Sequence, residues 1–295
     1  MRDDFCVFIL THGRPDRVHT YDTLMRSGYT GKVFIVIDDE DKTADGYRAR
    51  FGDKVLQFCK AEWAEKTDEG DNFQHRKAIV YARNACWNLA RQVGCRYFVQ
   101  LDDDYTSFFV RHDSKCNYVS ANLRNNLEGV FCELIEFSIR SKATAIAMSQ
   151  GGDHIGGGGE LVNGTSRGGC PYPRLARKAM NSWFCDVEKP IQFFGHMNED
   201  VSAYVTYGHR GQVFLTVMQA MLVQKPTQVT PGGMSDLYLS SGTYQKSFYT
   251  VMAAPSCVQI GAMGDPRGSD YRIHHKINWH KAVPKILDDR WRKAQ

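Results

Sequence analysis

The segment 97–106 reads YFVQLDDDYT, and it decides the fold because a strand-like run leads directly into three carboxylates. The apolar and aromatic residues at 96–101 predict an interior strand of a parallel sheet. In open α/β sheets the ligand crevice lies beyond the carboxyl ends of the strands. Along an extended chain Asp102 and Asp104 point to one side and Asp103 to the other, so the pair can share one divalent cation. A solvated acidic turn is the alternative interpretation.

The composition is that of an ordinary globular protein. The 295 residues are 42% hydrophobic and 24% charged with a net charge of +4, which permits an anionic ligand or nucleic acid without requiring either. The nine cysteines form no Cys-x-x-Cys pair, which argues against a zinc knuckle and indicates a reducing compartment. No secretory signal is found, and the longest apolar run, 213–223, is too short to span a bilayer. We expect one soluble, cytoplasmic domain over residues 1–295.

Strands and helices alternate in the first part of the chain, which predicts an α/β fold with a wound, mostly parallel sheet flanked by helices. The first strand leads into Thr11 and Arg14, and the second leads into Asp38 and Asp39, so polar groups reach the same edge of the sheet. We expect Asp16 to cap the first helix. The predicted strands are 5–10, 33–37, 54–58, 96–101 and 143–148, and the predicted helices are 16–27, 44–51, 73–93 and 122–141.

The predicted helix 73–93 is expected to begin at a cap formed by Asp71 or Asn72, which directs its electropositive end to the same rim. Arg83 and Asn84 on this helix are the candidates for reaching a ligand. The segment 212–224 fits a strand or a helix equally well.

A glycine-rich segment, 150–169, holds nine glycines. This density suits a loop that orders over a ligand, and an idle disordered loop is the alternative. No Gly-Lys-Ser/Thr follows, so it is not interpreted as a phosphate loop.

A second acidic group follows at Asn198, Glu199 and Asp200. Asn198 is a plausible helix cap, which places both acids in a first helical turn, where the helix dipole favours their ionised form. One carboxylate could take a proton from an acceptor hydroxyl, or both could merely stabilise the helix. Near the end, His274 and His275 point in opposite directions if extended, so at most one returns to the acidic site. We assign His275 as a candidate metal ligand, with contact to DNA phosphate or packing as alternatives.

In this order, the motifs resemble those of the GT-A glycosyltransferases: Thr11-x-x-Arg14-Pro15, Asp38-Asp39, Ala82-Arg83-Asn84, Asp102-Asp103-Asp104 and Glu199-Asp200. More narrowly, the chain is similar to the phage and kinetoplastid glycosyltransferases, associated with TET/JBP oxygenases, that add sugar to hydroxymethylated pyrimidines in DNA. The resemblance is good over about 5–106 and moderate around 193–204. It implies a GT-A-like sheet, with a nucleotide-sugar-binding half at 1–106 and an acceptor-side half at 107–295.

The resemblance also implies a UDP-sugar donor and Mn2+ or Mg2+, with a role for each matching residue. The metal would neutralise the departing diphosphate. Asp200 would be the general base of an inverting transfer, with Glu199 in reserve. The nucleoside site would include Thr11, Arg14, Asp38 and Asp39, and Arg83 would contact the nucleotide. In the acidic motif, Asp102 would bind the ribose or the metal, Asp103 would belong to the donor site, and Asp104 would bind the metal.

The implied acceptor is 5-hydroxymethylcytosine or 5-hydroxymethyluracil in DNA, whose base must leave the stack to be modified. Tyr172, Trp183 and Phe184 are candidates for wedging or stacking against it. A phage-encoded enzyme would act in the host-cell cytoplasm. A glycan, lipid or protein acceptor, a catalytically silent DNA-binding module and a nucleotidyltransferase are the alternatives. The candidate phosphate contacts are Arg167, Arg174, Arg177, Lys178, Lys276, Lys281, Lys285, Arg290, Arg292 and Lys293.

Overall fold

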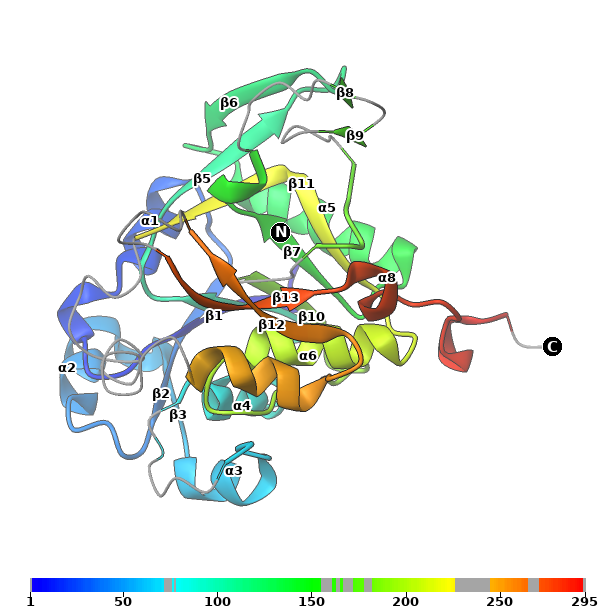
Figure 1. Ribbon diagram of the computed structural model, residues 1–295. Helices are drawn as coiled ribbons and strands as arrows, with labels where there is room; N and C mark the ends of the chain where they lie inside the picture. Colours follow the sequence, from blue (N-terminus) through cyan, green and yellow to red (C-terminus); the bar gives the residue numbers. More distant parts are fainter. Residues whose placement is uncertain are drawn as a thin grey trace.

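A nine-stranded sheet forms the centre of the computed structural model (Figure 1). The structure describes residues 2–71, 76, 78–154, 161–162, 165–166, 172–177, 182–225, 245–264 and 271–293. The sheet comprises β1 (Phe5–Leu10), β2 (Lys32–Asp38), β3 (Val55–Phe58), β4 (Tyr97–Asp102), β5 (Tyr105–His112), β6 (Tyr118–Asn122), β7 (Ala145–Ser149), β10 (Ser182–Asp186) and β11 (Phe214–Gln224). The helices are α1 (His19–Arg26), α2 (Ala44–Phe51), α3 (Lys60–Lys66), α4 (Val80–Gln92), α5 (Leu127–Ser141), α6 (Glu199–His209) and α8 (Trp279–Ala282), and residues 245–253 are also helical.

The first four strands of the sheet order β3-β2-β1-β4-β10-β7-β11-β5-β6 are parallel to one another. Every residue of β1 is buried, as expected for a central strand with both faces covered. The pairing of β1 with β4 sets Leu10 beside Asp102, where both strands end. The loops that follow these strands therefore start side by side at one edge of the sheet.

The other half of the sheet is mixed. Strand β10 runs antiparallel to β4 and β7, β11 is parallel to β7, and β5 is antiparallel to β11 and β6. Only β10 and β5 oppose the common direction, so the predicted mostly parallel α/β sheet is confirmed. The segment 212–224, which the sequence left undecided, contains the long strand β11.

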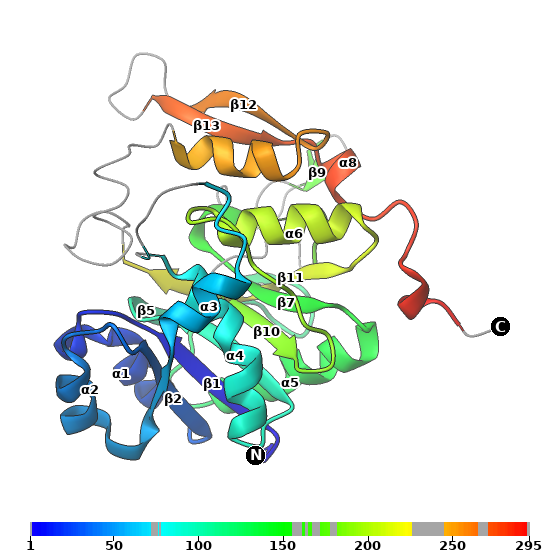
Figure 2. The same ribbon diagram turned by 90° about the horizontal axis from the view of Figure 1, so that it is seen from below.

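Helices cover both faces of the sheet (Figure 2). The buried side chains of α4 and α6 belong to one hydrophobic cluster, and those of α1, α2 and α5 belong to another. The ring of Trp87 on α4 lies 5.1 Å from that of Phe98 on β4, and Phe131 on α5 lies 5.2 Å from Phe184 on β10. Edge-to-face pairs of this kind add about 0.5–1.5 kcal/mol each beyond the area that they bury.

Two small hairpins complete the described chain. Strands β12 (Val258–Met263) and β13 (Arg272–Ile277) pair antiparallel, and in Figure 2 this hairpin and the helical residues 245–253 lie above α6. Strands β8 (Leu161–Val162) and β9 (Thr165–Ser166) form the other hairpin. No helix in the described residues is long and apolar enough to cross a bilayer.

The prediction that a helix spans 73–93 is wrong at its start, because α4 begins at Val80 after Ile79. Asp71 does not cap this helix. Its carboxylate lies 2.7 Å from Nδ1 of His196 and also accepts a hydrogen bond from Tyr249, which commits it to the loop before α6. The predicted cap at Asp71 is therefore wrong, and Asn72 lies outside the described residues.

Two other predicted helix starts also differ from the structure. Asp16 lies in a short 3-10 turn, and Val18, which has no capping side chain, precedes α1. The helix predicted from Asn122 begins at Leu127, because residues up to Asn122 pair with β5 as strand β6. Most of the glycine-rich segment 150–169 lies outside the described residues. Its expected role as a loop that covers a ligand therefore stays a prediction.

Candidate active site

Arg83 joins the two acidic groups that are far apart in the sequence. Its Nε donates to Oε1 of Glu199 at 2.8 Å, and its Nη2 donates to Oδ1 of Asp102 at 3.2 Å. Gln100 on β4 accepts from Nη1 of Arg83 at 3.5 Å and donates to its carbonyl oxygen at 2.9 Å. Helix α4, the end of β4 and the start of α6 thus meet at one buried guanidinium.

The carboxylates around Arg83 are held in a buried environment. Burial raises the pKa of Glu199 to about 7, against the effect of Arg83, and the charge of Asp200 adds to the rise. Burial likewise raises the pKa of Asp102 to about 6, opposed by Arg83 and assisted by Asp104 and Asp200. Removing one partner of a buried ion pair is strongly destabilising. Arg83 is therefore needed to hold the site together. It faces the carboxyl ends of β1, β2 and β4 and the start of α6, which together we call the donor edge.

Asp103 is fully committed to neighbouring side chains. Its Oδ2 accepts from Thr11 Oγ1 at 2.6 Å, and its Oδ1 lies 3.1 Å from Nη2 of Arg14. Burial raises the pKa of Asp103, and Arg14 and Thr11 oppose that rise. The hydroxyl of Tyr47 lies 2.9 Å from Thr11 Oγ1 and also accepts from the Arg14 backbone N–H at 2.8 Å. The Thr-x-x-Arg motif is thus fixed to the middle acid of the triplet.

The two acids at the carboxyl end of β2, Asp38 and Asp39, are contacted by His12 and Lys60. Nδ1 of His12 lies 2.7 Å from Oδ2 of Asp38, and Nζ of Lys60 lies 3.4 Å from Oδ1. Burial alone would raise the pKa of Asp38, but His12 and Lys60 together lower it. Asp39 is exposed, and its Oδ1 accepts from the Lys60 backbone N–H at 2.8 Å. Sequence reasoning missed Lys60, whose position after β3 has no motif, and His12, which adjoins Thr11.

Asp104 differs from its neighbours because only one of its two carboxylate oxygens has a hydrogen-bond partner among the described residues. Oδ2 accepts from Nε2 of Gln224 at 3.2 Å, whereas Oδ1 is buried and has no hydrogen-bond partner in the described structure. Burial raises the pKa of Asp104 to about 6, and the charge of Asp103 adds to the rise. A buried carboxylate oxygen without a donor is costly, so this atom is suited to a cation.

Asp200 stands at the start of α6 with its side chain only partly buried. Its Oδ1 accepts from the Val201 backbone N–H at 2.8 Å. Its charge acts on Asp102, Glu199 and the partly buried Lys246. Burial lowers the pKa of Lys246, and the charges of Asp200 and Glu199 oppose that change. Asp200 therefore lies among the acids that Arg83 gathers, but it is not paired with Arg83.

Asn198 occupies the predicted cap position of α6, but its side chain does not make the predicted capping hydrogen bond. Asn198 precedes α6 with a left-handed backbone, φ 54°, and its side chain makes no capping hydrogen bond. Nδ2 of Asn198 instead donates to the Lys246 carbonyl oxygen at 2.8 Å and lies 3.3 Å from Nδ1 of His275. His275 is buried, with its ring 4.2 Å from that of His274. His275 therefore lies next to Asn198, the residue that precedes α6. Its assignment as a metal ligand stays a prediction.

Several predicted contacts have structural roles instead. Asn84 is buried, donates to the Phe193 carbonyl oxygen at 2.9 Å and accepts from the Phe193 N–H at 2.8 Å, so it fastens the loop before α6 rather than reaching a ligand. Trp183 and Phe184 are fully buried in the two cores, so their prediction as DNA wedges is wrong. Tyr172 is 65% exposed, and its assignment as a stacking residue stays a prediction.

The candidate phosphate contacts fall into three groups. Arg177 is paired with Asp153, and Arg174 is partly buried beside β11. Arg167 and Lys178 lie outside the described residues. The exposed ones follow along β13 and the C-terminal segment: Lys276, Lys281, Lys285, Arg290, Arg292 and Lys293.

The described parts of the chain contain no group of three His, Cys, Asp or Glu side chains arranged to hold a metal. Asp102 and Asp104 provide two carboxylates. Protein sites for Mg2+ commonly use one or two carboxylates and complete the coordination with water and substrate phosphates. The donor set fits a metal that binds together with a diphosphate.

Comparison with known proteins identifies the family. A model of the TET-associated glycosyltransferases matches residues 5–233. No curated protein matches the chain significantly. Among solved structures, glucosyl-3-phosphoglycerate synthase from Mycobacterium tuberculosis, in complex with Mn2+, UDP and phosphoglyceric acid, is 12% identical over 92% of this chain and 86% of that chain, with a TM-score of 0.47. Residues 1–349 of S. aureus TarS are 11% identical over 74% of this chain and 59% of that chain, with a TM-score of 0.39.

The family match covers most of the chain and includes both acidic groups that Arg83 joins. It confirms the resemblance that the ordered motifs indicated. The chain belongs to the TET-associated glycosyltransferase family and is a glycosyltransferase.

Proposed function

We propose that the protein transfers a sugar from a UDP-sugar to the hydroxymethyl group of 5-hydroxymethylcytosine or 5-hydroxymethyluracil in DNA, with Mn2+ or Mg2+ bound at Asp102 and Asp104. Family membership supports the transferase, and the ordered motifs support the donor and the acceptor. Oδ1 of Asp104 is buried and has no hydrogen-bond partner among the described residues. This atom carries the proposal, because it favours a cation at the edge of the sheet where the diphosphate of a donor would lie.

The metal would be held by Asp102 and Asp104 and would offset the negative charge of the departing diphosphate. Both carboxylates have a raised pKa in the absence of a cation, so both are prepared to gain a positive partner. The prediction of His275 as a further ligand remains part of this proposal.

The nucleotide would lie along the loops after β1 and β2. Nε of Arg14 is buried without a hydrogen-bond partner in the described structure, so Arg14 can donate to the nucleotide while its Nη2 holds Asp103. Asp39 is exposed at the same edge and can accept from a ribose or base. Thr11 and Asp38 would act by positioning, because Asp103 and His12 already engage their polar atoms.

Asp200 is the general base of this mechanism. It would take the proton of the hydroxymethyl oxygen as that oxygen attacks the anomeric carbon, and the bond from this carbon to the diphosphate would break with its electron pair leaving on UDP. A single displacement of this kind inverts the anomeric carbon. Glu199 is less suited to this role because it is buried against Arg83, whereas Asp200 is partly exposed.

The test is a sugar-transfer assay with purified protein, Mn2+, a panel of UDP-sugars, and DNA with or without hydroxymethylated pyrimidines, read by mass spectrometry of the digested nucleosides. We expect a sugar mass increment only on hydroxymethylated nucleosides. Asp200→Asn should lower turnover by about 10²–10⁴-fold while the protein stays folded. Glu199→Gln is the comparison variant, and it should lower stability because it removes the charge opposite Arg83. Full turnover in Asp200→Asn would refute the assigned base, and transfer to a glycan or protein but not to DNA would refute the acceptor.

A further inference from the structure

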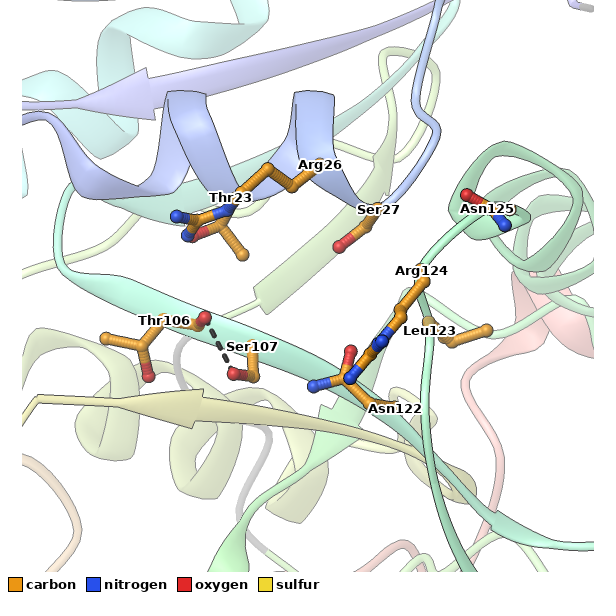
Figure 3. A pocket seen from close by; sticks show the side chains of 9 residues that line it. All are labelled: Thr23, Arg26, Ser27, Thr106, Ser107, Asn122, Leu123, Arg124 and Asn125. Carbon is orange, nitrogen blue, oxygen red and sulfur yellow. Dashed lines mark hydrogen bonds between the residues drawn. The ribbon is translucent and has the colours of Figure 1, made fainter.

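A cavity of about 500 Å³ lies on the opposite face of the sheet from α6, between α1, β5 and the loop before α5 (Figure 3). None of the predicted site residues lines it. Its walls are Thr23, Arg26 and Ser27 from the end of α1, Thr106 and Ser107 from β5, and Asn122, Leu123, Arg124 and Asn125 from the loop. We refer to it as the arginine cavity.

The two arginines stand on facing walls of the cavity, and neither forms an ion pair with a described residue. Both are exposed. Nη2 of Arg26 donates to Thr23 Oγ1 at 3.1 Å, which leaves most of its five N–H donors unused. Three acids on the adjoining helices are engaged elsewhere: Asp22 pairs with Arg50 at 3.3 Å, Glu128 accepts from Thr30, and Glu136 pairs with Arg2. The cavity therefore has positive charge without a counter-charge of its own.

The chemistry of the walls indicates which anion fits. Apart from Leu123, the lining side chains are arginines, asparagines, serines and threonines. These are the side chains that contact phosphate and sugar oxygens in protein–DNA complexes, where they set position and carry no sequence information directly. No aromatic side chain among the described residues lines the cavity, so its described walls offer no surface on which a base could stack. A sugar-phosphate backbone fits better than a free nucleotide.

The cavity is connected to the acidic triplet through α1. Oγ1 of Thr20 donates to the Asp102 carbonyl oxygen at 2.5 Å, and Oγ1 of Thr23, which lines the cavity, donates to the Tyr105 carbonyl oxygen at 3.0 Å. Ser107 is the third residue after Asp104, which lies in the turn before β5, so the two residues are at most about 10 Å apart at roughly 3.3 Å per extended residue. One strand of DNA carries a phosphate every ~3.4 Å of helix axis, so this distance corresponds to about three nucleotides.

We propose that the arginine cavity binds backbone phosphates of the DNA acceptor, a few nucleotides from the base that receives the sugar. Arg26 and Arg124 each contact a phosphate, and the neighbouring hydroxyls and amides complete the contacts. The choice of DNA rests on the proposed function, whereas the preference for phosphate rests on the cavity itself. Since these contacts read no sequence, they hold modified and unmodified DNA equally.

The test compares the double variant Arg26→Gln/Arg124→Gln with Arg140→Gln/Arg210→Gln, which removes two exposed arginines elsewhere. The dissociation constant of a labelled hydroxymethylated duplex is measured by fluorescence anisotropy across a salt series. Because the cavity variant can no longer neutralise two phosphates, the slope of log K against log salt should become less negative by about 1.8, and binding should weaken on the order of 10- to 100-fold at 0.1 M salt. UDP binding, measured by calorimetry, and the melting temperature should not change.

The outcomes separate this proposal from the proposed function. If the wild-type protein binds DNA and the cavity variant binds it as well as the control variant does, the cavity proposal fails and the proposed function stands. If the cavity variant weakens DNA binding without changing the salt slope, or loses UDP binding, the arginines do not hold DNA phosphate and the proposal fails. If wild-type protein binds no DNA at any salt concentration, both this proposal and the DNA acceptor of the proposed function fail.

Discussion

The donor edge and the arginine cavity both contain charged groups without a partner of opposite sign among the described residues. These groups are negative at the donor edge and positive in the cavity. At the donor edge Asp102, Asp103 and Glu199 are paired with arginines, whereas Asp104 keeps one buried oxygen that has no partner among the described residues. In the cavity Arg26 and Arg124 have no acidic partner among the described residues, and three acids on the adjoining helices are engaged elsewhere. In both regions the paired charges position the chain, and the unpaired ones indicate a ligand of opposite sign. The comparison therefore points to a cation at one region and a phosphate at the other.

The largest effect is expected from Arg83→Met, which removes a paired charge at the donor edge. Asp102 and Glu199 would then remain buried without their shared cation, so the free energy of unfolding should fall by about 3–5 kcal/mol. Urea unfolding followed by circular dichroism measures this loss. Arg91→Met, on an exposed position of the same helix, is the control and should cost no more than about 1 kcal/mol. Equal losses in the two variants would show that Arg83 is not the centre of the donor edge.

A smaller effect is expected from pH, and it acts on the two proposed metal ligands, of which Asp102 is paired with Arg83 and Asp104 keeps an unpartnered oxygen within the described structure. Asp102 and Asp104 must be deprotonated to hold a metal, and their pKa is about 6 without it. At pH 5 each group is mostly protonated, so Mn2+ affinity should fall by up to about 100-fold relative to pH 7.5, as each carboxylate one pH unit below its pKa contributes about tenfold. Calorimetric titration of Mn2+ with UDP present at both pH values measures this. An affinity independent of pH would contradict the assignment of these ligands.

The same shifts predict the pH dependence of stability in the metal-free protein. The pKa of both groups is higher in the folded state than the usual value of 3.8, so the folded protein binds more protons than the unfolded chain between about pH 4 and 6. Their contribution to the free energy of unfolding should therefore increase as the pH falls through that range. A comparison of Asp104→Asn with the wild-type protein isolates this contribution, since the variant should lose part of the increase.

The smallest effect is expected from Thr11→Val, which removes one positioning contact. Oδ2 of Asp103 would lose its 2.6 Å hydrogen bond, and the expected loss of stability is about 1.5–3 kcal/mol. Thr30→Val, which removes an exposed threonine that contacts Glu128, is the control and should change stability by about 0.5 kcal/mol or less. Thermal melts of both variants test whether paired and exposed contacts differ in this way.

Much of the fold could be predicted because hydrophobic runs and acids mark the strand ends. The runs at 5–10, 33–37 and 96–101 correspond to β1, β2 and β4, and the parallel pairing of these strands brings their loops to one edge. Helix starts were harder. The helix predicted over 73–93 starts before α4, and its expected cap, Asp71, instead contacts His196, a partner 125 residues away that no local pattern indicates.

The site could be predicted only in part, for a similar reason. The motif residues Thr11, Arg14 and Asp103 do meet, but nothing local shows that Arg83 binds Glu199 or that Gln224 reaches Asp104. Those partners come from elements distant in the chain. The arginine cavity was missed for the same reason, since α1, β5 and the loop before α5 each contribute only part of its wall. Trp183 was misassigned because an aromatic among basic residues has the same pattern whether it is buried or exposed.

The proposed metal site is tested by isothermal titration calorimetry of Mn2+ with the wild-type protein and with Asp104→Asn, in the presence of UDP near pH 7.5. Asp186→Asn is the matched control, since Asp186 is a buried acid paired with Arg96 and lies at the far end of β10 from the donor edge. We expect one Mn2+ per chain in the wild type and the control, and an affinity at least about 10²-fold weaker in Asp104→Asn. If Asp104→Asn binds Mn2+ as tightly as the wild type, the buried oxygen of Asp104 is not a metal ligand and the proposed donor site is wrong.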